Sequence, residues 1–180
     1  MRGWLAISLS IVAALFATSI ALAQIKPVAR VAVNSLDSLM ADFKYLATAT
    51  DNAPGWNAAQ VLLKGFTEGI DRTKPLGLVI LAEGEKIKGY GFVPVKNLNA
   101  IVETIETNLG IEIAAAGNGI SKAESPLGTF YFKEIQGWAY IAMKVEDLQG
   151  VAADPSKYVA PLLAKYDVPG EVYVKNLSLI

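Results

Sequence analysis

The chain has 180 residues and a formal net charge of −1, and it contains neither histidine nor cysteine. The absence of histidine excludes Ser-His-Asp and Cys-His catalysis, imidazole acid–base chemistry near neutral pH, and nearly every zinc or iron site. The absence of cysteine excludes disulfides. The chain has no concentrated cationic segment, so a nucleic-acid-binding surface is not predicted.

The N-terminal segment has the pattern of an export signal. Arg2 is its only charged residue. An apolar run from Trp4 to Leu22 follows, and the segment ends in Ala21-Leu22-Ala23, with small residues at its first and third positions. Small residues at these positions fit signal peptidase, so we predict that residues 1–23 form a signal peptide cleaved near Ala23. The mature chain is then expected to be periplasmic or secreted. The alternative is a retained anchor, because the run is long enough to span about 30 Å of hydrocarbon; membrane contact is expected only in that case.

The first elements of the remaining chain are a strand and two helices. Residues 28–33 are rich in valine and predict a strand. Apolar residues at helical spacing then predict a helix capped by Ser35, and a second helix after the breaker sequence at 51–55. Gly65 and Gly69 fall on one face of this second helix, which predicts a close approach to a neighbouring element.

The middle of the chain changes to a strand pattern. Residues 76–81 and 87–93 predict two strands joined by a polar turn. The first is apolar at every position except its glycine, so we expect both of its faces to be covered. A helix capped by Asn97 or Asn99 follows and ends at Gly110. Its apolar stripe consists of Leu98, Ile101, Val102, Ile105 and Leu109.

The last third of the chain is typical of a β-meander with a short helix near its end. The predicted strands are 111–115, 120–123, 129–135, 138–143 and, after the helix, 171–175. Pro161 is expected in the first turn of that helix, because a proline in a helix interior costs about 3 kcal/mol.

Hairpins outnumber strand–helix–strand units in this order of elements. We therefore predict an α+β fold, with a mostly antiparallel β-sheet and helices packed on one face. Residues 24–180 are expected to form a single domain, since no linker or low-complexity stretch interrupts them.

Several short motifs resemble those of one family. They are Lys74-Pro75-Leu76-Gly77, Gly91-Phe92-Val93-Pro94-Val95, Gly137-Trp138-Ala139-Tyr140-Ile141 and Pro161-Leu162-Leu163. Together with the closing alternating segment, they resemble a group of exported bacterial proteins of unknown function, mainly of the planctomycete type. The resemblance covers most of residues 28–176 and implies no catalytic residue. It also implies that residues 24–180 are the N-terminal part of a longer protein.

The chain contains few candidates for acid–base or phosphate chemistry. Glu103 and Glu106 are neighbours on their helix, and paired carboxylates can hydrolyse glycosidic bonds. Because both lie opposite the apolar stripe, we expect them to face water. The glycines at 117 and 119 fit a hairpin turn better than a dinucleotide site. No catalytic, cofactor-binding or metal-binding residue is therefore predicted.

Tyr90 and Trp138 are the candidates for stacking against a ligand. Aromatic residues on strands usually pack in the core. If both rings project from the same exposed face of the sheet, they form a groove for a sugar or a peptide. The expected partner is accordingly an envelope protein or a saccharide.

These observations favour an exported, non-catalytic binding or assembly module of the cell envelope. One alternative is a carboxylate-dependent hydrolase, which requires two acidic groups in one cleft. Another is a carrier of an apolar ligand, which requires a cavity of about 300 Å³ or more. A large apolar pocket lined by residues such as Phe43, Phe66 or Ile105 would favour the carrier.

Overall fold

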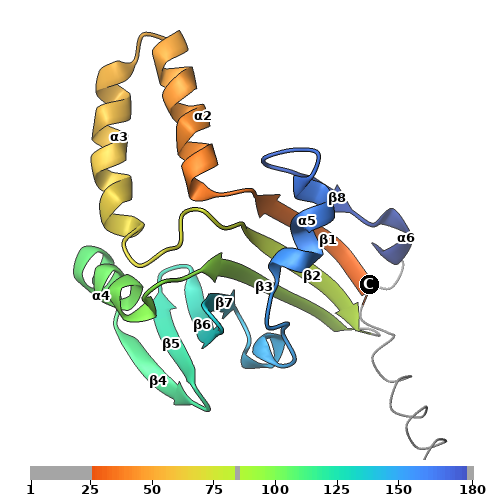
Figure 1. Cartoon of the computed structure of the whole chain (residues 1–180). Helices are drawn as coiled ribbons and strands as arrows, with labels where there is room; N and C mark the ends of the chain where they lie inside the picture. Colours follow the sequence, from red (N-terminus) through yellow and green to blue (C-terminus); the bar gives the residue numbers. More distant parts are fainter. Residues whose placement is uncertain (1–25, 84–85, 178–180) are drawn as a thin grey trace, which may run out of the picture.

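The computed structural model describes residues 26–83 and 86–177. Its centre is one sheet of eight strands in the order β4-β5-β6-β7-β3-β2-β1-β8, with antiparallel neighbours throughout (Figure 1). The strands are β1 (Lys26–Val33), β2 (Leu76–Glu83), β3 (Lys86–Pro94), β4 (Ile113–Gly117), β5 (Ile120–Ser125), β6 (Gly128–Ile135), β7 (Trp138–Ala142) and β8 (Gly170–Val172). The predicted α+β class with a mostly antiparallel sheet is confirmed. The predicted signal peptide, residues 1–23, lies outside the described residues.

The helices begin and end largely where the capping residues predict. They are α2 (Leu36–Ala49), α3 (Ala53–Phe66), α4 (Leu98–Leu109), the 3-10 helix η1 (Val145–Leu148), α5 (Ser156–Leu163) and α6 (Val174–Leu177). The Ser35 hydroxyl accepts a hydrogen bond from the Ser38 N–H at 2.9 Å and caps α2. Asn97 caps α4 in the same way, and Gly110 ends that helix in the left-handed conformation.

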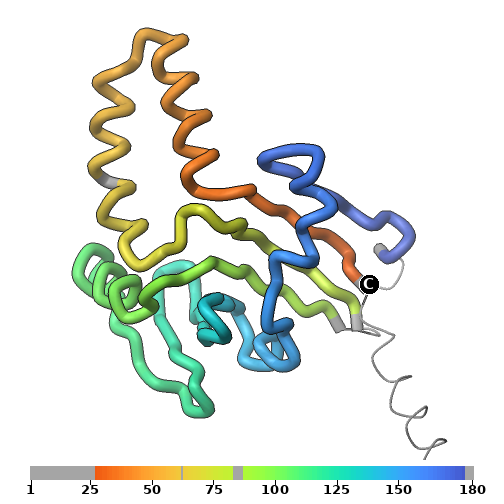
Figure 2. Tube along the Cα trace, in the orientation of Figure 1, coloured from red at the N-terminus to blue at the C-terminus, as the bar shows by residue number. Residues whose placement is uncertain are grey.

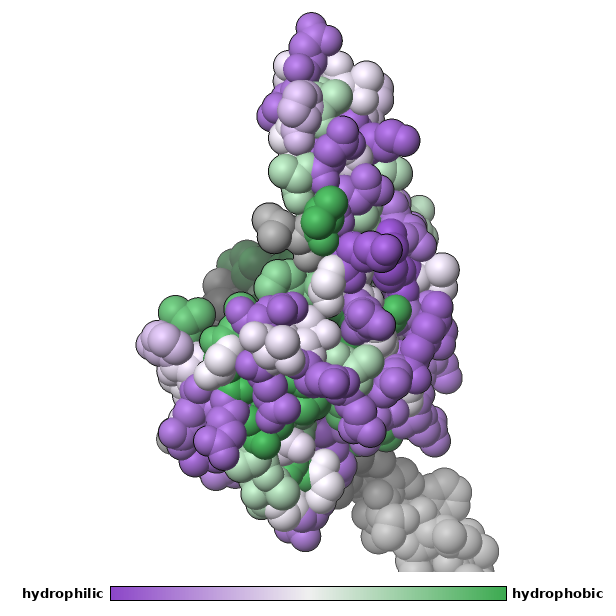
Figure 3. Space-filling view, turned by 90° about the vertical axis from the view of Figure 1, so that its left-hand side faces the viewer, coloured by the Kyte–Doolittle hydropathy of each residue, from purple (hydrophilic) through white to green (hydrophobic). Residues whose placement is uncertain are grey.

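Helices α2 and α3 form a hairpin that stands away from the sheet (Figure 2). Each is 14 residues long, and no residue of α2 is buried. Figure 3 shows this hairpin above the body of the molecule, with apolar side chains among polar ones along it. Its base is held by an ion pair between Arg72 and Asp37, whose atoms lie 2.6 Å apart.

One face of the sheet, here named the covered face, carries the hydrophobic core. Helices α5 and η1 pack on it through Val159 and Leu148, which are both buried. The core residues contributed by the strands are Ala32, Val79, Tyr90, Phe92, Ile120, Trp138, Tyr140 and Ala142. Their rings meet edge to face, at centroid distances of 5.7 Å for Tyr90 with Tyr140 and 5.9 Å for Phe92 with Trp138. Such pairs stabilise the fold beyond the area that they bury.

The opposite face, here named the open face, is covered only in part. Helix α4 lies against its β5–β7 side, so the helices are divided between the two faces. On the neighbouring strands β2 and β1, Leu78 and Val31 are register partners on this face, and they remain 44% and 46% exposed. The expectation that both faces of β2 are covered is therefore wrong. Its apolar run has one face in the core, whereas on the other face Leu78 is exposed and Leu76 and Ile80 are half-buried.

Three local predictions also require correction. Pro161 lies inside α5 rather than in its first turn. Because Pro161 and Lys157 are both exposed, water can satisfy the Lys157 carbonyl that the missing proline N–H leaves open. The final strand ends at Val172, since α6 begins at Val174. Gly69 lies beyond the end of α3, with a positive φ of 85°.

Strand β8 is attached to β1 through an ion pair. The Arg30 Nη2 lies 2.7 Å from the Glu171 Oε2, and the guanidinium lies over the Tyr173 ring at 5.3 Å from its centroid. A hydrogen bond from the Tyr173 side chain, followed by the bond from Arg30, holds the pKa of Glu171 below its ordinary value of 4.5. A carboxyl group with a lowered pKa stabilises the fold above its ordinary pKa, and this contribution disappears as the pH falls through the lowered pKa.

We expect an NMR titration of the full chain to give a midpoint for the Glu171 carboxyl below 4.5. Replacing Tyr173 by phenylalanine removes the main cause, so the midpoint should rise towards the ordinary value. Tyr166→Phe is the matched control, because Tyr166 is an exposed tyrosine outside this contact. Equal midpoints in the Tyr173→Phe variant and the wild type would show that the tyrosine does not act on Glu171.

Candidate functional site

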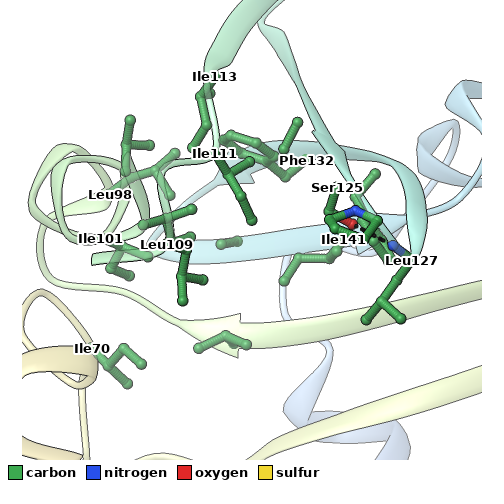
Figure 4. A pocket seen from close by; sticks show the side chains of 17 residues that line it. Ile70, Leu98, Ile101, Leu109, Ile111, Ile113, Ser125, Leu127, Phe132 and Ile141 are labelled. Carbon is green, nitrogen blue, oxygen red and sulfur yellow. Dashed lines mark hydrogen bonds between the residues drawn. The ribbon is translucent and has the colours of Figure 1, made fainter. Parts of the chain in front are cut away.

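A groove lies on the open face between α4 and strands β5, β6 and β7, and its cavity volume is about 630 Å³. We name it the α4 groove. Leu98, Ile101 and Ile105 of α4 form one wall. The floor comes from open-face residues of the strands, which are Phe130, Phe132, Ala139 and Ile141. Figure 4 shows the α4 side chains and the strand side chains on opposite sides of the space.

The groove follows from two simple periodicities. Residues of α4 at spacings of three and four lie on one side of the helix, which gives the isoleucine wall. In the strands, alternate residues point to the same face, so Phe132 and its register partner Ile141 lie side by side. The bridge between Ile70 and Val95 places Ile70 at the end of the groove near α3.

The lining of the groove offers no free hydrogen-bonding side chain. Ser125, the last residue of β5 before the turn to β6, is its one polar residue. The Ser125 hydroxyl donates to the Gly128 carbonyl at 3.1 Å and accepts from the Leu127 N–H at 3.2 Å, so its hydrogen bonds are made within the turn. Leu127 stands at the rim and is 83% exposed. The groove is therefore suited to hydrocarbon rather than to a polar ligand.

Tyr90 and Trp138 lie on the same face of the sheet, as a stacking groove would require. That face is the covered one, and the two residues are only 4% and 6% exposed. Tyr90 packs against Tyr140 and Trp138 against Phe92, with Lys74 Nζ 6.0 Å from the Trp138 ring centroid. Burial raises the pKa of Tyr90 to about 12. The condition of an exposed face is not fulfilled, and both rings serve the core.

Among the described residues, the acidic candidates for a hydrolase at Glu68, Glu103 and Glu106 are exposed to solvent rather than buried together in a cleft. Glu103 and Glu106 are exposed, as expected, and the Glu106 Oε1 accepts a hydrogen bond from the Ile113 N–H at 3.2 Å. Glu68 and Glu103 line a shallow pocket between α3 and α4, and both are exposed. In the described part of the chain, no three acidic residues gather closely enough to hold a metal ion.

The residues that form the α4 groove were predicted only on the helix side. Ile105 lines it, as anticipated for a carrier, whereas Phe43 and Phe66 lie on the projecting hairpin outside it. The strand residues of the floor were assigned to strands but not to a pocket. Pairing 129–135 with 138–143 in register would have placed Phe132 and Ile141 on one face.

No protein-family model, curated protein or solved structure matches the chain. The resemblance to exported planctomycete-type proteins therefore stays a prediction. Of the helices in residues 26–83 and 86–177, none is both long and apolar enough to cross a bilayer.

Proposed function

We propose that the protein is an exported, non-catalytic binding module of the cell envelope that takes up the hydrocarbon part of an apolar ligand in the α4 groove. The observation that carries the proposal is a cavity of about 630 Å³ whose lining is apolar apart from Ser125, whose hydroxyl is hydrogen-bonded within its turn. Ligand pockets of proteins span about 300–1,000 Å³. Export is supported by the sequence pattern of residues 1–23.

The energetics of such binding are favourable but modest. Each methylene transferred from water contributes about 0.8 kcal/mol, so a chain of about eight methylenes contributes up to about 6 kcal/mol before other terms. The loss of translational and rotational freedom opposes binding by several kcal/mol. We therefore expect weak affinity, with specificity for the length of the hydrocarbon rather than for its head group.

The groove is poorly suited to the hydrolase alternative. None of its lining residues is ionisable. General acid–base hydrolysis needs a group that can donate and accept protons at the bond being broken. A ligand held in the α4 groove would therefore be lined by side chains that cannot transfer protons, which favours binding over turnover.

We expect the full chain to bind decanol in isothermal titration calorimetry. Replacing Ile105 by aspartate should lower the affinity for decanol at least ten-fold. The buried carboxylate would face hydrocarbon without a partner. Thr107→Asp, at an exposed position of the same helix, is the matched control and should bind like the wild type. Circular dichroism checks that both variants keep their fold.

A second variant distinguishes weaker binding caused by a filled groove from weaker binding caused by an unstable helix. Ala123 lines the groove, and leucine at this position adds apolar volume without adding charge. Ala123→Leu should weaken decanol binding while leaving the melting temperature unchanged or raised. If the wild type takes up no decanol, or if both groove variants bind it as tightly as the wild type, the proposed function is wrong.

A further inference from the structure

A second pocket lies on the covered face, on the other side of the sheet from the α4 groove. Its volume is about 280 Å³, and it is bounded by β1, β2, β3 and the segment from η1 to α5. Unlike the α4 groove, it has a mixed lining. The polar contributors are Arg30, Lys88, Tyr90, Asp147, Gln149 and Tyr158.

Asp147 is the acceptor built into this pocket. Asp147 belongs to η1, and only 8% of its surface is exposed. Aspartate is rarely buried to this extent unless it is paired. The Asp147 Oδ2 accepts a hydrogen bond from the Gly89 N–H at 3.2 Å, which holds the carboxylate against β3. An ionised carboxylate has about four acceptor positions, so this bond leaves capacity for donors of a ligand.

The lining of the pocket carries charges of both signs. The Arg30 guanidinium pairs with Glu171, which is outside the pocket, and also donates to the Tyr158 carbonyl. The lining also contains Lys88 and Asp147, whose charges have opposite signs. Asp147 would repel an anion, and Lys88 and Arg30 would repel a cation. A neutral ligand meets neither repulsion.

The walls combine hydrogen-bonding groups with apolar surface. Val79, Leu81 and Val151 form the apolar part. A hydroxyl group both donates and accepts hydrogen bonds, so it can pair with a carboxylate and with cationic or phenolic donors. A ring that has several hydroxyls at its edge and C–H groups on its face matches both parts of this lining. The volume admits one such ring.

We propose that this pocket binds a single neutral sugar unit, with Asp147 accepting hydrogen bonds from its hydroxyls. The proposal does not depend on the α4 groove, because the two sites lie on opposite faces of the sheet. The sugar would be an isolated monosaccharide or the terminal unit of a glycan. Tyr90 takes part through the wall of the pocket and not through an exposed ring face.

The test is saturation-transfer NMR on the full chain with glucose, galactose, mannose and N-acetylglucosamine, followed by titration of the best binder. Asp147→Asn keeps an oxygen acceptor for the Gly89 N–H but removes the charge, so the affinity should fall about ten-fold. Gln149→Trp places a bulky ring at an exposed wall residue and should abolish binding. Asp154→Asn is the control, because Asp154 bonds to Ser156 outside the pocket and should not affect binding.

Ile105→Asp in the α4 groove should bind the sugar normally, so the failure of one site is distinguishable from the failure of the other. The proposal is overturned if the folded wild type binds none of the four sugars. It is also overturned if Asp147→Asn and Gln149→Trp bind like the wild type, or if glucuronate is preferred to glucose.

Discussion

Replacing Phe92 by alanine is expected to lower the free energy of unfolding by about 3–5 kcal/mol, the usual cost of removing a fully buried phenylalanine. Phe92 has no exposed surface and lies on β3 at the centre of the covered face. Its ring meets Trp138 edge to face and lies beside Gly77 of β2. No smaller side chain can fill this space without moving two strands, so a cavity should remain.

Urea denaturation followed by circular dichroism measures this loss. In a domain of this size, 1 kcal/mol corresponds to about 2–4 °C in melting temperature, so the variant should melt well below the wild type. Phe43→Ala is the matched control, because Phe43 is 50% exposed on α2. Similar losses in the two variants would mean that Phe92 does not lie in the core.

The second large effect is expected at Gly69, where alanine should destabilise the protein by about 2–5 kcal/mol. The residue has a φ of 85°, which costs a side-chain-bearing residue about 1–2 kcal/mol. An added Cβ would also lie 2.4 Å from the Asn97 carbonyl oxygen and 2.9 Å from the Ile101 Cγ1. Overpacking of this kind typically costs a further 1–3 kcal/mol.

Gly110→Ala separates the two causes. Gly110 also has a positive φ, of 63°, but an added Cβ would meet no heavy atom within 4 Å. Its replacement should therefore cost only the conformational part. The difference between the unfolding free energies of the two variants measures the close approach of Gly69 to α4. A difference near zero would mean that this contact is absent in solution.

The parts of the fold that depend on local chemistry were predictable from the sequence. Ser35 and Asn97 begin helices because their side chains accept bonds from N–H groups of the first turn. Gly110 ends α4 because glycine tolerates a positive φ. The strands were predictable for a similar reason. Period-two patterns and turn residues indicate them without reference to the rest of the chain.

The parts that depend on tertiary contacts were not predictable. The apolar run of β2 has the composition of a strand buried on both sides, yet on one side it is covered only in part. The sequence near β2 does not determine which strands a helix will cover. In the structure, α4 packs over β5–β7 rather than over β2. The same reason applies to Tyr90 and Trp138, whose shared face could be derived from spacing but whose burial depends on α5 and η1.

The candidate site shows the same division. The stripe of α4 predicted an apolar face, but a stripe packed closely against a sheet leaves no cavity. The space exists because of how far α4 lies from Phe132 and Ile141, which no residue pattern encodes. Asp147 lies outside the strands and helices that the sequence predicts, and its burial depends on the contact of η1 with β3 and β7.

The projecting α2–α3 hairpin has a consequence for how the molecule opens. Isolated helices of about 14 residues are marginal in water, and their stability in proteins comes from packing. Helix α2 buries none of its residues, and the Arg72–Asp37 pair holds only its base. Its amide protons should therefore exchange with solvent through local opening far more often than those of β2 or β3. The hairpin would then melt as a separate cooperative unit while the sheet stays intact.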